Sequence, residues 1–160
     1  MNEKILSPQF VRTLQISLLA LAAGVVMFGV VTFAILLISK SADGSTMLAS
    51  AGTLTVAHAI VAVALFPAGF LVFNVILTRN LEPGALQARI QAAYIMRAAL
   101  WEGAAIFGLV ILIVTGKPAL AEMPVYWANL ISPLICLTLM ALTFPTRIRL
   151  EGLIRTRGPA

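Results

Sequence analysis

Glu102 is the residue whose type and position most strongly suggest chemistry. It stands in an apolar stretch, roughly 12 Å along a helix that enters a membrane near residue 94. A carboxylate at that depth costs at least about 2.5–3.5 kcal/mol, so it needs water, a partner or a proton. Two roles stay open for it. Glu102 is either a structural acid that hydrogen-bonds another helix or a site that binds and releases an ion or proton.

Two other polar residues could support Glu102. His58 is the only histidine and falls near one end of the second apolar stretch. One histidine cannot ligate a haem from both sides, and zinc needs more ligands, so we expect neither a metal nor a cofactor. Arg97 is five residues before Glu102 and does not share its helix face. We expect its long side chain to reach the cytoplasmic headgroups, with pairing to another helix or subunit as the alternative.

Small residues at a spacing of four surround Glu102 and recur in the first apolar stretch. Such pairs allow close approach of membrane helices. We therefore expect packing roles for these five positions: Gly24, Gly29, Ala99, Gly103 and Gly108. Both stretches also contain a Gly-x-x-x-Phe-Gly pattern, so duplication of a helical hairpin is an open alternative. Cys136, Asn74 and Asn129 are expected to contribute packing or hydrogen bonds between helices.

The composition determines which elements must position these residues. Hydrophobic residues make up 61% of the 160-residue chain and charged residues 11%, against about 45–50% and about 25% in soluble domains. We predict an all-α polytopic membrane protein, a single transmembrane domain covering 1–160. Its four spanning helices are expected at about 13–39, 54–77, 85–115 and 123–146. The third should extend into the cytoplasm, and residues 147–157 should continue the fourth.

The basic residues predict the orientation. Nine of the 11 Lys and Arg residues fall in the two tails or in the connection between the second and third helices, and only Lys40 and Lys117 lie on the other side. The positive-inside rule then places both termini in the cytoplasm of a bacterium, with the helices in the inner membrane. The net charge of +5 is accounted for by this signal. No nucleic acid is expected as a partner, because no recognition module accompanies the basic residues.

A family resemblance covers about residues 81–116. The segment Ala98-Ala99-Leu100-Trp101-Glu102-Gly103-Ala104-Ala105-Ile106-Phe107-Gly108-Leu109-Val110 follows a polar loop. It resembles the second half of the proteolipid (c-type) subunit of rotary ATPases. The resemblance implies that Glu102 is an ion-binding carboxylate that takes protons or sodium ions. The overall pattern is also similar to small uncharacterised bacterial four-helix inner-membrane proteins.

Two functional hypotheses follow. In the first, the chain is a structural or accessory membrane protein that self-associates, or joins a larger membrane complex, through small-residue helix faces. In the second, it is a proteolipid-like ring subunit that binds protons or ions at Glu102. We expect no enzyme and no catalytic residue, because the sequence contains no phosphate loop, nucleophile–base pattern or dinucleotide fingerprint. The lipid bilayer is the partner common to both hypotheses.

Overall fold

A computed structural model describes residues 6–38, 45–78 and 86–157, and the calls on Lys40 and on the two ends of the chain lie outside these ranges. Every described element is helical. The elements are α1 (Pro8–Ile38), α2 (Ser45–Thr78), α3 (Leu86–Glu122), the 3-10 helix η3 (Pro124–Leu130), α4 (Ile131–Leu142) and α5 (Arg147–Arg157). Four helical stretches are long and apolar enough to cross a membrane: Pro8–Ile38, Ser50–Thr78, Leu86–Glu122 and Pro124–Leu142. The chain is therefore a membrane protein with a helical transmembrane bundle.

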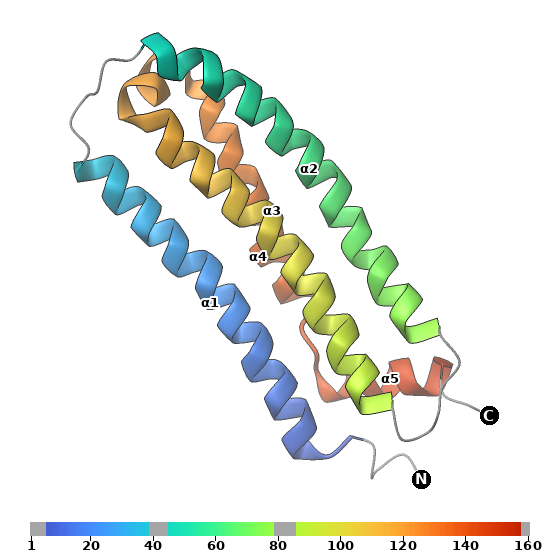
Figure 1. The fold of residues 1–160 in the computed structure, drawn as a ribbon. Coiled ribbons are helices and arrows are strands. Elements are labelled where there is room, and N and C mark those ends of the chain that lie inside the picture. The colour runs from blue at the N-terminus through green and yellow to red at the C-terminus, as the bar shows by residue number, and fades with distance from the viewer. Residues whose placement is uncertain (1–5, 39–44, 79–85, 158–160) are drawn as a thin grey trace.

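Helix α3 is the centre of the bundle. It packs against α1, α2, η3 and α4, and Figure 1 shows it between α1 and α2 with α4 behind. Half of its most apolar window is buried, against 17% for α1 and 11% for α2. The fully buried Ile90, Trp101 and Leu112 project from α3 into the core. Most contacts between helices consequently involve residues of α3.

The turn between α3 and η3 differs in detail from the expected loop. Gly116 has φ 72° and ψ 162°, a backbone conformation that only glycine adopts readily. The helical ladder breaks there and resumes for one short stretch to Glu122 before Pro124 opens η3. Helix α2 also begins earlier than expected, at Ser45 rather than near residue 54. Its first residues include Ala, Met and Leu, which favour helices.

The fourth spanning segment is not continuous with the C-terminal helix. Helix α4 ends at Leu142, and Pro145 interrupts the backbone before α5 begins at Arg147. The Arg149 guanidinium donates to the carbonyl oxygens of Leu142 and Phe144, which α4 leaves without helical partners. Gln15 of α1 donates to the Pro145 carbonyl oxygen over 3.0 Å. The expectation of one helix through residue 157 is therefore replaced by a turn anchored to α1.

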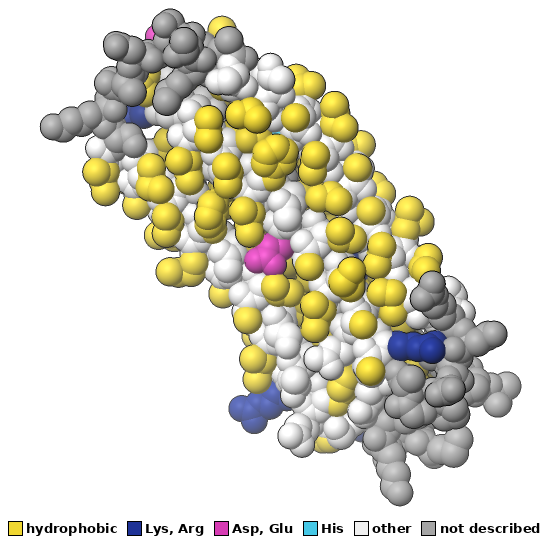
Figure 2. Space-filling view, in the orientation of Figure 1, with side chains coloured by type: hydrophobic (Ala, Val, Ile, Leu, Met, Phe, Trp, Pro, Cys, Tyr) yellow, Lys and Arg dark blue, Asp and Glu magenta, His cyan; other side chains and the backbone are white. Residues whose placement is uncertain are grey.

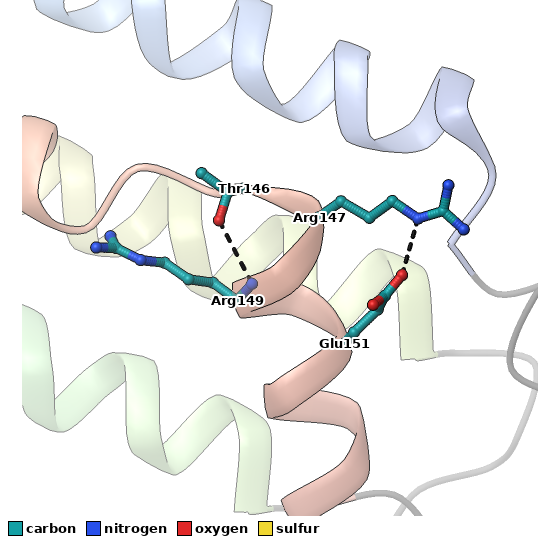
Figure 3. Close-up of polar contacts among 4 residues, drawn as sticks. All are labelled: Thr146, Arg147, Arg149 and Glu151. Carbon is teal, nitrogen blue, oxygen red and sulfur yellow. Dashed lines mark hydrogen bonds and ion pairs between the residues drawn. The ribbon is translucent and has the colours of Figure 1, made fainter.

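Helix α5 lies across one end of the bundle (Figure 1). Leu150 and Ile154 are buried against the core, whereas Ile148 is exposed. Figure 3 shows two polar contacts that define its first turn. The Thr146 hydroxyl oxygen accepts from the Arg149 amide over 3.4 Å, as a helix N-cap does. Arg147 and Glu151 form an exposed ion pair at 2.8 Å.

Candidate functional site

Glu102 lies at mid-length of α3 and is half-buried. Figure 2 shows acidic atoms midway along a face that is otherwise covered by apolar side chains. Its carboxylate faces α1, because a Cβ added to Gly24 would lie 3.1 Å from Glu102 Oε1. Cys136 of α4 is close enough for an electrostatic interaction with the carboxylate. No hydrogen bond or ion pair to Glu102 is found within the described ranges.

The five small residues expected to pack between helices separate into two groups. Gly24 faces Glu102, Gly29 has Leu109 at the limit of contact at 4.0 Å, and Gly108 is enclosed. Gly103 has no atom within 4 Å of its added Cβ, and both Ala99 and Gly103 are exposed. Ala99 and Gly103 therefore make no close helix contact of this kind inside the described part of the chain, and a packing role for them stays a prediction. Their side of α3 points outward beside Glu102.

Arg97 is buried, with 6% of its surface exposed, instead of reaching out to headgroups. Its guanidinium carbon lies 4.2 Å from the centre of the Phe73 ring, 4.8 Å from that of Tyr94 and 5.1 Å from that of Trp101. These distances are typical of cation–π contacts. Arg97 Nη2 also donates to the Thr143 carbonyl oxygen over 3.5 Å. Arg97 thus joins α2, α3 and the end of α4, and it is not brought together with Glu102.

His58 belongs to a second polar site, which lies against Ala104 and Gly108 of α3. The ring is 4% exposed. Its Nδ1 lies 2.8 Å from Asn129 Oδ1, and its Nε2 lies 2.8 Å from Ser132 Oγ. The ring of Phe107 meets it edge-on, with centroids 5.6 Å apart. One side chain from α2, one from η3 and one from α4 are therefore linked in a line.

The hydrogen-bond partners of Asn129 determine which nitrogen of His58 faces an acceptor. Its Nδ2 donates to the Tyr126 carbonyl oxygen over 2.9 Å and to Thr55 Oγ1 over 3.0 Å. A carbonyl oxygen can only accept, so the amide cannot be flipped, and Oδ1 is the acceptor that faces His58. His58 Nδ1 must then carry the hydrogen. In the neutral ring, Nε2 is an acceptor for the Ser132 hydroxyl, whose hydrogen can also go to the Ala104 carbonyl oxygen at 3.2 Å or the Asn129 carbonyl oxygen at 3.4 Å. In the charged ring, Nε2 instead donates to the Ala104 carbonyl oxygen at 3.2 Å.

Gly108 on α3 makes room for this line. A Cβ added there would lie 2.5 Å from the Asn129 carbonyl oxygen, 2.7 Å from Ser132 Oγ and 2.8 Å from His58 Cε1. These separations are shorter than any normal carbon contact. The neighbouring Ala104 carbonyl oxygen lies 3.2 Å from both Ser132 Oγ and His58 Nε2. Helix α3 therefore contacts all three polar residues through Ala104 and Gly108.

A cavity of about 490 Å³ opens beside the line, between α2 and the η3–α4 segment. Thr55, His58, Asn129 and Ser132 line one part of it, and apolar side chains line the rest. Val63 at its edge is 75% exposed, and Ile131 is 55% exposed. The cavity consequently opens sideways, toward the region that the bilayer occupies.

Sequence reasoning singled out His58 and expected packing or hydrogen bonds between helices from Asn129, and the hydrogen bonds to α2 are present. It missed Thr55, Ser132 and the arrangement of all four. A signal was present. Thr55 and His58 are three residues apart in one apolar stretch, and Asn129 and Ser132 are three apart in another. Residues at that spacing share a helix face. Two such polar pairs in apolar segments point to a shared internal site.

No group of three or more His, Cys, Asp or Glu side chains that could hold a metal ion occurs in the described part of the chain. The chain was also compared with known proteins. No protein-family model, curated protein or solved structure matches it. The chemistry of these two sites must therefore be argued from their geometry.

Proposed function

We propose that this chain is a structural or accessory membrane protein that associates laterally through the uncovered side of α3. The partner is a second copy of the chain or a helix of a larger membrane complex. The uncovered side is made by Ala99 and Gly103, with Met96 48% exposed next to them. Small residues allow another helix to approach closely, which maximises van der Waals contact where lipid offers no hydrophobic drive. We call this surface the α3 face.

The observation that carries the proposal is the position of Glu102 next to the α3 face. The carboxyl group lies at mid-length of the bundle without a hydrogen bond from the described residues. Polar groups in hydrocarbon are expensive unless they are paired, and such residues usually face a partner helix or water. A helix docked on Ala99 and Gly103 would offer a hydroxyl, an amide or a second carboxyl group within reach.

The proposal includes an orientation. The start of α1, the end of α2, the start of α3 and α5 lie at one end of the bundle (Figure 1), and Arg12, Arg89 and Arg155 belong to that end. By the positive-inside rule we assign this end to the cytoplasm of a bacterial inner membrane. A reporter enzyme that works only in the cytoplasm should be active when it is fused after residue 157. If a reporter that works only after export across the membrane is active at this position, the assignment is reversed.

Cysteine cross-linking in native membranes tests the association. Cys136 is buried and is first replaced by alanine to leave a cysteine-free chain. Gly103→Cys should then give a disulfide-linked dimer under mild oxidation, because the position is open and central in the α3 face. Ala64→Cys, at an exposed position of α2, is the matched control and should give little product. Equal cross-linking at both positions, or none at 103, would contradict self-association.

A larger complex would give a different result in the same membranes. There, a photo-reactive amino acid at position 103 would cross-link to a distinct chain, visible as one additional band of fixed mass. In the otherwise wild-type chain, Gly103→Leu should abolish either association, measured as loss of the complex in mild detergent, without unfolding the chain, since nothing lies within 4 Å of its Cβ position. Glu102→Gln keeps hydrogen-bonding capacity and should retain most of the association. Persistence of the complex with Gly103→Leu would exclude the α3 face.

Binding of a proton or sodium ion at Glu102 is the second candidate function. The observation that favours it is the approach of the carboxylate to Gly24, at the boundary of α1 and α3, where a side chain would obstruct it. A hydrophobic carbodiimide should then modify Glu102 in the membrane. If the carboxyl group binds sodium ions, added sodium should protect it from modification. If it binds protons, high pH should protect it. Modification that neither condition changes would eliminate an exchangeable site.

A further inference from the structure

The line of Asn129, His58 and Ser132 has the geometry of an activated serine. A serine nucleophile needs a base within about 2.6–3.2 Å of its oxygen, and a third group that orients the base. Ser132 Oγ lies 2.8 Å from His58 Nε2, and His58 Nδ1 lies 2.8 Å from Asn129 Oδ1. We propose that Ser132 is a nucleophile activated by His58 and that it accepts acyl groups from lipid-soluble esters.

This chemistry requires the neutral ring with its hydrogen on Nδ1, and the bond to Asn129 Oδ1 places a hydrogen on that nitrogen. Because Asn129 Oδ1 accepts from Nδ1, the neutral ring presents the Nε2 lone pair to the Ser132 hydroxyl. The orienting amide is itself held by the Tyr126 carbonyl oxygen and by Thr55. Asn129 is therefore a positioning residue.

The cavity beside Ser132 defines the class of substrate. Its lining is polar at Thr55, His58, Asn129 and Ser132 and apolar elsewhere, with residues such as Ala62 and Ile135. An acyl chain could lie along the apolar part while its ester group reaches the polar part. Water-soluble esters would have to cross the exposed apolar edge at Val63 and Ile131. Esters that partition into the bilayer are therefore the favoured substrates.

Thr55 supplies a hydrogen-bond donor at the same place. Its oxygen accepts from Asn129 Nδ2 over 3.0 Å, and no acceptor for its own hydroxyl hydrogen is found among the described residues. Thr55 also lines the cavity. Its hydroxyl can consequently donate to the oxygen that becomes negative when a carbonyl is attacked. A donor aimed at developing charge stabilises such transition states.

The reaction proceeds in two steps. Ser132 Oγ attacks the ester carbonyl carbon, and its proton moves to His58 Nε2. The bond from that carbon to the alcohol oxygen breaks, the alcohol leaves with the proton, and the acyl group remains on Ser132. Water then adds to the acyl carbon, with His58 taking its proton and returning it to Ser132, and the free acid leaves.

An alkyl fluorophosphonate probe with a long chain tests the nucleophile directly. The full chain is incubated with the probe in mild detergent and digested, and the modified peptide is identified by mass spectrometry. The expected result is one adduct, on Ser132, formed with loss of fluoride. Ser17 is the internal control, since it is exposed on α1 and its hydroxyl donates to the Thr13 carbonyl oxygen. Labelling of Ser17 but not Ser132 in the folded protein would overturn the proposal.

Two variants separate activation from packing. His58→Gln can still hydrogen-bond but cannot act as a base, so the rate of labelling should fall about 10²-fold or more. Ser132→Ala should abolish the adduct. Folding of each variant is checked by its thermal unfolding in the same detergent. If His58→Gln remains folded and labels at the wild-type rate, the line is structural only and the proposal fails. Peptide mapping of wild-type protein decides the question even where a variant does not fold.

Discussion

Replacing Gly108 with alanine should disrupt the contact between α3 and the η3–α4 segment. The added Cβ would lie 2.5 Å from the Asn129 carbonyl oxygen and 2.7 Å from Ser132 Oγ. Neither atom can move freely, because one belongs to the backbone and the other is hydrogen-bonded to His58. The helices must separate by several tenths of an ångström or the line of hydrogen bonds must break.

The size of the effect follows from three contributions. Overpacking a filled site costs about 1–3 kcal/mol. Weakening one buried hydrogen bond adds about 0.5–1.5 kcal/mol. Replacing a glycine in a helix interior returns about 0.5–1 kcal/mol of backbone entropy. The expected net loss in free energy of unfolding for Gly108→Ala is about 2 kcal/mol, within a range of about 0.5–4 kcal/mol.

Gly103→Ala is the matched control, five residues earlier on the same helix. Nothing lies within 4 Å of its Cβ position, so only the entropy contribution remains and stability should be unchanged or raised by up to about 1 kcal/mol. Both variants are unfolded with a denaturing detergent and followed by circular dichroism. A Gly108→Ala protein as stable as wild type, or equal losses in the two variants, would refute the assigned packing of α3.

Four further substitutions test other contacts. Trp101→Phe removes the indole hydrogen bond to the Phe66 carbonyl oxygen and should cost about 0.5–1.5 kcal/mol in the same unfolding assay; no loss would mean that the bond is replaced by another. Arg97→Lys removes the planar contact with three rings and should cost about 1–2 kcal/mol, whereas full stability would show that charge alone suffices. Thr146→Ala removes the N-cap of α5 and should cost about 1 kcal/mol locally, measured as faster proteolysis of the C-terminal segment. Glu151→Ala breaks an exposed ion pair and should change stability by less than about 1 kcal/mol, so a larger loss would indicate a docking role for α5.

The four spanning segments could be predicted from the sequence because spanning is a local property. Transfer free energies add along consecutive residues, and about 20 apolar residues suffice. The break at Gly116 was also visible, since glycine and a nearby Pro118 interrupt helices. The break between α4 and α5 was harder to predict from the sequence. Residues 147–157 have helical composition, and the turn at Pro145 depends on Arg149 and Gln15 reaching carbonyl oxygens from other parts of the chain.

The candidate site shows the same division. The sequence alone marked Glu102 as an expensive group at mid-membrane depth, because that cost depends on depth along one helix. It could not distinguish Gly103 from Gly108, which are both helical and both preceded by a small residue at a spacing of four. The rotation of α3 against its neighbours buries one and exposes the other. That rotation results from contacts between residues far apart in the chain, which no local pattern encodes.

The sequence by itself therefore determined the class of protein, the number of spans and the one carboxylate at mid-membrane depth. Only the tertiary structure decided that His58, Asn129 and Ser132 meet and that Arg97 lies among aromatic rings. The physical reason is the range of the forces. Hydrophobic transfer acts residue by residue along a helix, whereas hydrogen bonds and ring contacts require atoms of different helices within a few ångströms.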